Sequence, residues 1–292
     1  MNTSHIDYLA IGQRLRAYRI AASLRAEDVA ENLKISRAAV YRLEKGELVK
    51  IETLDRLATL LNTSLTSLLG VDTEYYSSGD GFFERMRQLE EQSTTVYSHF
   101  DPFSFLLTSD NYLQHLSMML MESSSLTVTE KHKIDSALAI LRERKAHFQQ
   151  HSPQVINLVG IQHIERFLHL GLVGSLNLSP SKKMERTLLA RQEVLHLIQQ
   201  IEENPKTLKI AITKNVVPSL TFQIFYREAT PLSLAISPFR LGEFPNVSTG
   251  IASITSSMDA IRRYQKLFDQ LWENSVENSK AIDLLKETLE RY

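Results

Sequence analysis

The sequence predicts two domains: an all-α domain of five helices, then an α/β (α+β) domain with a small antiparallel sheet. Three observations support this fold class. Apolar residues recur at helical spacing through 1–72. A run rich in Ser, Gly and Asp follows, and short β-branched and aromatic runs begin after Pro205. We therefore expect a helical domain at 1–72, a linker with a short helix at 73–94, and the α/β domain at 95–292.

Composition limits the classes of protein to which the chain can belong. With 292 residues and a net charge of −1, it is long enough for two domains with ordinary globular composition. It has no cysteine, and no apolar run reaches the ~18 residues that a membrane span requires. The first residues lack the basic and apolar segments of a secretory signal. We expect a cytoplasmic protein with no membrane partner.

The stretch 25–46 predicts two short helices joined by a tight turn. Apolar residues keep helical spacing on both sides of the turn at 34–36, where the pattern breaks. Ser36 is a suitable N-cap for the second helix, and Gly46 a suitable residue to follow its end. Two helices with a turn of three to four residues have the proportions of a DNA-binding helix-turn-helix.

Longer motifs in the same region strengthen this interpretation. IGQRLR begins at Ile11, SRAAVYRLEKG at Ser36, LDRLA at Leu54 and SLTSLL at Ser64. In this order and spacing, residues 11–70 resemble the lambda-repressor-like (XRE) helix-turn-helix family. The resemblance implies five helices, DNA binding and an ion pair between Arg19 and Glu44. It covers only the first quarter of the chain.

The resemblance also identifies the expected DNA contacts. Arg37, Ala38 and Arg42 would face base edges, and arginine can bond guanine with two hydrogen bonds. Tyr41 would reach a phosphate or a thymine methyl group, and Lys45 would contact the DNA backbone. The family often has Gln at the start of its second helix, whereas this chain has Ala26 preceded by Arg25, the expected substitute phosphate contact. The complete set of predicted DNA-binding residues is Arg25, Ala26, Ser36, Arg37, Ala38, Tyr41, Arg42 and Lys45.

The rest of the chain mixes helical and strand-like segments. Thr127 and Glu130 form a capping box before a long helix, and Ser179-Pro180 begins another that runs to about Glu203. Residues 154–160 indicate either a buried strand or the start of an apolar helix. Strand-like runs, expected to be antiparallel neighbours, occupy 207–213, 220–226 and 231–237, with a further strand at 250–255. Two helices, at 258–274 and 279–291, complete the domain.

The second domain lacks a recognisable catalytic signature. It has no phosphate-binding glycine loop, zinc-protease motif or nucleophile elbow, so we expect no catalytic residue and no cofactor. His147 and His151, with Glu165, could bind a metal, but Ser152-Pro153 ends their helix, which favours no metal site. The aromatic residues of 95–126 could line an effector pocket, although core packing is favoured. Arg240 could hold an acidic effector, although a surface arginine is favoured.

Together these features predict a sequence-specific, repressor-like transcription regulator. Its expected partners are double-stranded DNA, a second copy in a homodimer on a near-palindromic operator, and a small-molecule effector of the C-terminal domain. Two alternatives remain open. One is an enzyme with an appended helix-turn-helix, and the other is an antitoxin-like protein-interaction module, which in this family is usually much shorter.

Overall fold

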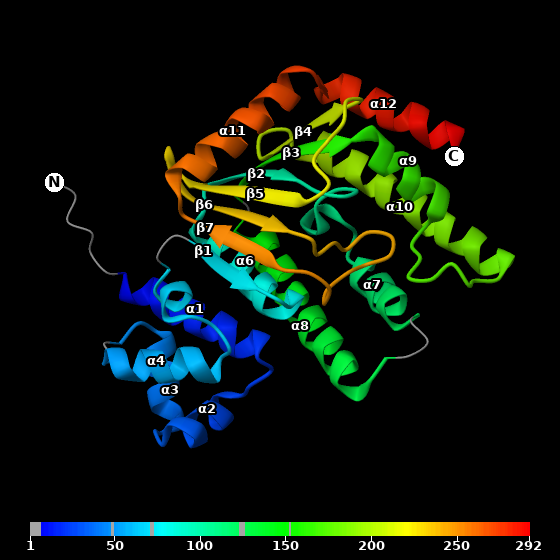
Figure 1. Cartoon of the computed structure of the whole chain (residues 1–292). Coiled ribbons are helices and arrows are strands. Elements are labelled where there is room, and N and C mark those ends of the chain that lie inside the picture. The colour runs from blue at the N-terminus through cyan, green and yellow to red at the C-terminus, as the bar shows by residue number, and fades with distance from the viewer. Residues whose placement is uncertain (1–6, 48–49, 71–72, 123–125, 152) are drawn as a thin grey trace.

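The computed structural model describes residues 7–47, 50–70, 73–122, 126–151 and 153–292. Five helices form a bundle at the N-terminal end (Figure 1). Local caps and breakers such as Ser36, Ser64 and Gly70 set the bounds of α3 and α5. The bounds of all five helices are α1 (Tyr8–Ala21), α2 (Ala26–Leu33), α3 (Arg37–Glu44), α4 (Ile51–Leu60) and α5 (Leu65–Leu69).

Among the described residues, a mixed sheet of eight strands forms the centre of the C-terminal part of the chain. Its order is β1-β7-β6-β5-β2-β3-β4-β8. Strands β2, β3 and β4 are parallel, and the other neighbouring pairs are antiparallel. The strands are β1 (Thr73–Tyr76), β2 (Thr95–His99), β3 (Gln154–Gly160), β4 (Leu208–Thr213), β5 (Thr221–Arg227), β6 (Thr230–Ser237), β7 (Ala252–Thr255) and β8 (Val276–Glu277).

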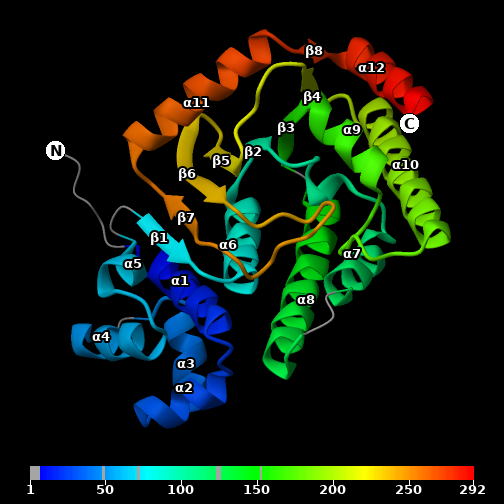
Figure 2. The same ribbon diagram turned by 45° about the vertical axis from the view of Figure 1, so that its right-hand side comes forward.

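Helices cover both faces of this sheet. Helix α11 covers one face, where Phe268 packs among Phe222, Ile224 and Leu234. Helices α6 and α8 lie on the other face, next to the N-terminal bundle (Figure 2). The remaining helices line the parallel side and the C-terminal edge. The bounds are α6 (Gly79–Gln92), η1 (Phe105–Leu107), α7 (Tyr112–Met121), α8 (Val128–Gln150), α9 (Ile161–Leu170), α10 (Pro180–Glu203), α11 (Met258–Glu273) and α12 (Asn278–Arg291).

The bundle and the sheet are joined by a buried contact between α1 and the segment that contains β1 and α6. Tyr18 stacks on Tyr76 with ring centroids 4.8 Å apart, and its hydroxyl accepts a hydrogen bond from the Tyr75 amide. Gly81 lies so close to α1 that a Cβ atom there would be 2.8 Å from the Ala17 carbonyl oxygen. The position of the bundle on the sheet is therefore set by close packing.

Charged side chains are also buried in this junction. Glu74 on β1 accepts hydrogen bonds from Arg85 of α6 and lies 3.7 Å from Arg14 of α1. The Glu84 carboxylate is fully buried and contacts both Arg87 and Arg16. Burial alone would raise the pKa of Glu84, but the hydrogen bonds and positive charges outweigh it, so the pKa is lowered and the carboxylate is ionised.

The prediction of a small antiparallel sheet is wrong, because the sheet has eight strands and is mixed. The segment predicted at 207–213 is a strand, but it pairs with β3 and β8 and not with β5. Strands β1, β2 and β8 were not predicted. Of the two possibilities for 154–160, the strand is correct.

The segment 73–94 was predicted to be a linker with a short helix. Its helix is present as α6, but residues 73–76 form an edge strand with Tyr76 fully buried. Most of α6 is buried between α1 and α8, so this segment is a structural layer between the two parts of the chain. Residues 71–72, the predicted end of the helical domain, lie outside the part of the chain that the structure describes.

Candidate nucleic-acid interface

The turn between α2 and α3 fixes the direction in which α3 leaves the bundle. Lys34, which ends α2, has a left-handed backbone with φ of 56°. The Ser36 hydroxyl then accepts a hydrogen bond of 3.1 Å from the Ala39 amide and caps α3. Val29 and Val40, one on each helix, are fully buried and hold the pair together. The predicted cap is confirmed.

Helix α3 is also fixed against α1. The predicted pair is confirmed, since the Arg19 guanidinium donates to both carboxylate oxygens of Glu44, at 2.5 and 3.2 Å. Gly12 permits the close approach, because a Cβ atom at this position would lie 2.6 Å from the Leu43 carbonyl oxygen. With its inner face held in this way, α3 presents its other face to solvent.

That outer face carries most of the predicted DNA contacts. The side chains of Arg37 and Arg42 are each 61% exposed. Ala38, Tyr41 and Lys45 are exposed on the same helix or at its end. This arrangement offers two guanidinium groups, a methyl group, a phenol and an ammonium group to one partner. It suits a surface with many hydrogen-bond acceptors and negative charge.

Acidic neighbours hold the two arginines loosely. Arg37 is 2.8 Å from Glu27 and donates a hydrogen bond of 3.1 Å to the Tyr41 hydroxyl. The bond to Tyr41 and the charge of Glu27 raise the pKa of Arg37. Arg42 lies 3.5 Å from Glu47. Exposed pairs of this kind contribute little to stability because solvent screens them, so the arginines can exchange these partners for another.

The N-terminus of α2 differs from the prediction in one respect. Arg25 is exposed, as a phosphate contact requires, and pairs with Asp28 at 3.1 Å. The hydrogen bond from Arg25 lowers the pKa of Asp28. The Ala26 side chain, however, is buried in the bundle, so only its backbone amide could contact DNA. The Ser36 hydroxyl is likewise occupied by its cap bond, although the residue is exposed.

Residues 10–69 match the family model described as "Helix-turn-helix domain". The chain therefore carries an N-terminal helix-turn-helix domain. The match covers α1 to α5 and includes every predicted DNA-contact residue. No curated protein matches the chain. The family match thus concerns the helical bundle alone.

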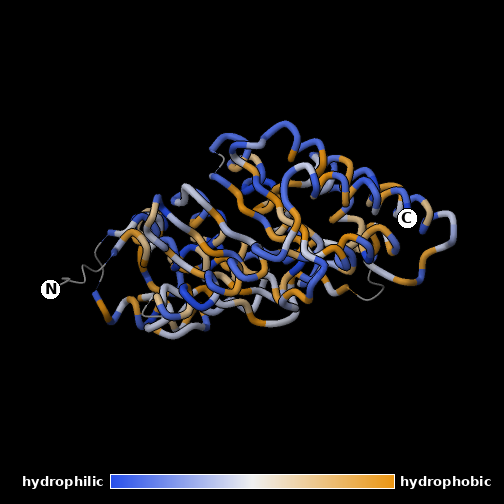
Figure 3. The backbone as a smooth tube through the Cα atoms, turned by 90° about the horizontal axis from the view of Figure 1, so that it is seen from above, coloured by the Kyte–Doolittle hydropathy of each residue, from blue (hydrophilic) through white to orange (hydrophobic). Residues whose placement is uncertain are grey.

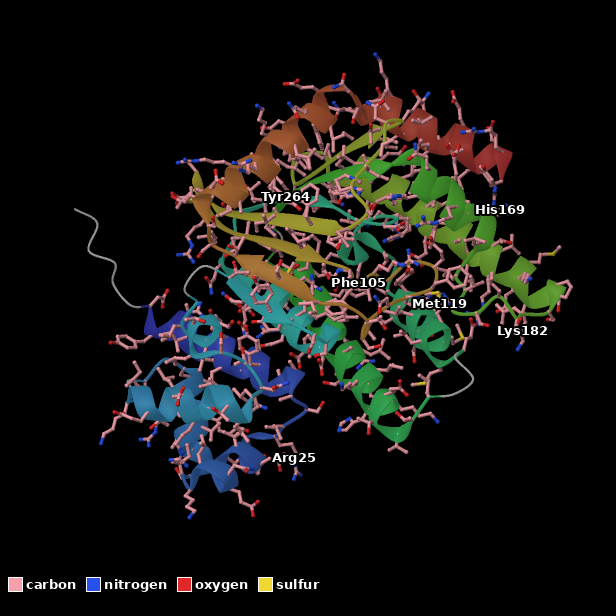
Figure 4. All side chains as sticks on the ribbon, viewed as in Figure 1. Arg25, Phe105, Met119, His169, Lys182 and Tyr264 are labelled. Atoms are coloured by element: carbon pink, nitrogen blue, oxygen red, sulfur yellow. The ribbon has the colours of Figure 1, made fainter. Side chains whose placement is uncertain are left out.

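A groove of about 350 Å³ borders the helix-turn-helix domain on the side of α8. One wall contains Arg25, Ala26 and Tyr41, and the other contains His132 and Ser136 of α8. Figure 4 shows Arg25 at the outer end of the bundle, on the side that faces α8. Sequence reasoning missed this neighbour, because no local pattern brings α8 next to a helix a hundred residues earlier.

The aromatic residues of 95–126 were predicted to pack in the core, with an effector pocket as the alternative. Several of them are buried in the core, and some also line a small cavity. Phe100, Phe103 and Phe105 line a cavity of about 40 Å³ beneath the sheet, with Arg144 and Gln223. Effector sites commonly have volumes of about 300–1,000 Å³, whereas one water in the liquid occupies about 30 Å³. This cavity therefore has room for one or two water molecules.

The other candidate groups of the sheet domain have partners within the chain. Arg240 lies 3.4 Å from Asp101, which also binds Arg166. His147 and His151 stack with ring centroids 4.8 Å apart. Glu165 pairs instead with Arg291. Within the described part of the chain, no group of three or more histidine or acidic side chains is arranged to hold a metal ion, and no helix could cross a membrane.

Proposed function

We propose that this protein is a sequence-specific transcription regulator that inserts α3 into the major groove of double-stranded DNA. The observation that carries the proposal is the exposed face of α3, on a bundle that matches a helix-turn-helix domain. Arg37 and Arg42 are exposed, and their pairs with Glu27 and Glu47 are weak. Regulation by binding, without catalysis, is part of the proposal.

Recognition would begin with an exchange of partners. Phosphates and guanine edges replace Glu27 and Glu47, and each arginine can then make two hydrogen bonds to guanine O6 and N7. Such a pair discriminates against a wrong base by ~1–3 kcal/mol. Ala38 would contact a thymine methyl group. Lys45 and Arg25 would position the helix through phosphate contacts, which carry no sequence information.

The proposal includes a second copy of the chain, because one short recognition helix reads few base pairs. Two helices related by a twofold axis would read a near-palindromic operator whose half-sites lie one helical turn, ~34–36 Å, or a multiple of this apart. The sheet domain would supply the contact between copies, respond to a small molecule, or do both. The buried junction at α6 supports coupling between the sheet domain and the DNA-binding helices, since it connects the sheet to α1 directly.

Selection of DNA from a random library with the full-length protein, at a stated salt concentration, tests the proposal. We expect recovery of one defined motif, bound more tightly than random DNA of equal length. Recovery of no motif, with either no binding or only salt-sensitive binding to all DNA, would contradict the proposal. The complete chain is used because the bundle packs against α6 and β1.

A further inference from the structure

The groove between the helix-turn-helix domain and α8 opens next to the outer face of α3, the proposed DNA-reading surface. Glu27 and Tyr41 line this groove, and both contact Arg37, one of the two arginines proposed to bind bases. The first turn of α2 also lines it, and the amide groups of a first turn have no partner within their helix, which favours phosphate binding. A DNA strand whose bases meet Arg37 therefore has this groove beside its backbone.

Helix α8 forms the other wall of the groove. His132 and Ser136 line it, and because they are four residues apart they lie one turn from each other on the same face of α8. His132 is exposed and Ser136 is half-buried. Within the described part of the chain, neither side chain has a hydrogen-bond or ion-pair partner. An imidazole N–H and a hydroxyl group are therefore free to donate to a molecule in the groove.

The charges around the groove are balanced. The acidic side chains on the bundle side each have a basic partner, in the pairs Arg19–Glu44, Arg25–Asp28 and Arg37–Glu27. The first turns of α8 also carry equal numbers of basic and acidic side chains: Lys131, Lys133, Glu130 and Asp135. Such a groove attracts a free anion only weakly. A phosphate that is brought there by insertion of α3 into the major groove, however, requires only nearby hydrogen-bond donors.

Helix α8 extends from the sheet toward the helix-turn-helix domain. In Figures 1 and 2, the first turns of α8 lie on the same lower side of the molecule as α2 and α3. Helix α11, in contrast, covers the face of the sheet opposite α8. The view from above places the N-terminal bundle at one end of the molecule and the C-terminus at the other (Figure 3). Helix α8 is therefore the helix of the sheet domain that borders the proposed DNA-binding surface.

We propose that α8 is part of the DNA interface and that His132 and Ser136 bind the phosphate backbone at one edge of each half-site, next to the phosphate that Arg25 contacts. The imidazole and the hydroxyl group donate to phosphate oxygens, which positions the protein but carries no sequence information. The sheet domain thereby gains a direct contact with DNA, and a shift of α8 changes the affinity for every site by the same factor. This inference rests on the proposed function, because it requires α3 to occupy the major groove.

Cleavage of DNA by a tethered iron chelate tests this contact. The chain has no cysteine, so Ser136→Cys provides a single thiol to which an iron–EDTA group can be attached. On the DNA motif selected by the wild type, we expect strand cleavage at one edge of each half-site. The matched control is Ser279→Cys, at an exposed serine in the first turn of α12, which should give no cleavage. Equal cleavage by both variants, or none by Ser136→Cys on bound DNA, would overturn the α8 contact while the selected motif still supports the proposed function. Failure of the wild type to select any motif would overturn both.

Charge substitutions at His132 provide a second test. His132→Arg should raise DNA affinity and steepen the slope of log K against log salt by about 0.9, the change expected for one more neutralised phosphate. His132→Glu should weaken binding. Both effects should be the same for the selected motif and its single-base variants, because phosphate contacts do not distinguish bases. Gln270→Arg and Gln270→Glu, at an exposed position of α11, are the controls and should leave affinity nearly unchanged. Equal effects at the two positions, or altered base preference in the His132 variants, would overturn the proposal.

Discussion

Two groups of arginines in this molecule lie in opposite environments, one exposed and one buried. On α3, Arg37 and Arg42 are mostly exposed, and their acidic partners are exposed too. At the junction of α1, β1 and α6, Arg85 and Glu74 are each less than 10% exposed. An exposed pair can be exchanged at little cost, whereas a buried pair cannot be broken without leaving a charge uncompensated. The first set is therefore available to a partner, and the second fixes the bundle on the sheet.

The largest effect should come from removing one member of the buried pair. In Glu74→Ala, the Arg85 guanidinium would lose its carboxylate and the Tyr76 hydroxyl its acceptor. We expect the free energy of unfolding to fall by about 3–5 kcal/mol in urea titrations. Glu47→Ala, on the exposed side of the comparison, is the control and should change it by less than about 1 kcal/mol. Similar losses in both variants would remove the distinction between the two sets.

The next largest effect should follow from filling the space between α1 and α6. In Gly81→Ala, the added Cβ would press on Ala17 and Ala21 of α1. Overpacking of this kind usually costs about 1–3 kcal/mol, even though alanine favours a helix more than glycine does. Urea unfolding measures the loss of stability. Relative to the wild type, the variant should also speed hydrogen exchange more in α1 than in α11. A more stable variant would show that this junction is loosely packed.

A smaller effect should appear on the exposed side. Glu47→Gln removes the acidic partner of Arg42 and one negative charge from the proposed DNA surface. Since such pairs contribute about 0–1 kcal/mol, DNA affinity should rise by at most about fivefold. Fluorescence anisotropy with a labelled duplex measures the change, with Asp259→Gln as the control because that residue pairs with Arg263 on the distant helix α11. Weaker binding by Glu47→Gln alone would show that Glu47 supports recognition.

The smallest effect concerns pH. Burial lowers the pKa of His99 below its usual 6.5, although its contacts with the Leu158 and Pro218 carbonyls oppose the shift. The unfolded chain therefore binds this proton more readily than the folded chain. The free energy of unfolding consequently decreases as pH falls below about 6.5. Urea unfolding at about pH 7.5 and about pH 5.5 should show this decrease, and His99→Asn should reduce it. An unchanged slope in the variant would assign the pH dependence to other groups.

The sequence predicted the bundle better than the sheet for a physical reason. Helix bounds depend on local caps such as Ser36 and Thr127, and local spacing is visible in a sequence. Strand neighbours depend on pairing between distant segments. For example, β1 pairs with β7 about 180 residues later, and β2 has the parallel partner β3 beyond α7 and α8. Thr73–Tyr76 has three residues of types common in strands, but four residues before a Ser- and Gly-rich run are too short a signal to distinguish an edge strand from a linker.

The candidate interface was predictable for the same reason, with limits. The exposed positions of α3 follow from its cap and apolar spacing. Burial of the Ala26 side chain and the acidic partners of Arg37 and Arg42 depend on how the helices pack, which the local sequence does not show. The neighbouring α8 wall, with His132, could not have been inferred from any local motif.

Base discrimination by Arg42 tests the central claim most directly. Binding of the selected DNA motif and its single-base variants should be compared for wild type, Arg42→Ala and Arg263→Ala, an exposed, ion-paired arginine on α11. We predict that Arg42→Ala loses about 1–3 kcal/mol of preference at one base pair of each half-site, while Arg263→Ala retains it. Unchanged preference in Arg42→Ala, or equal loss in both variants, would contradict the assignment of α3 as the element that reads DNA.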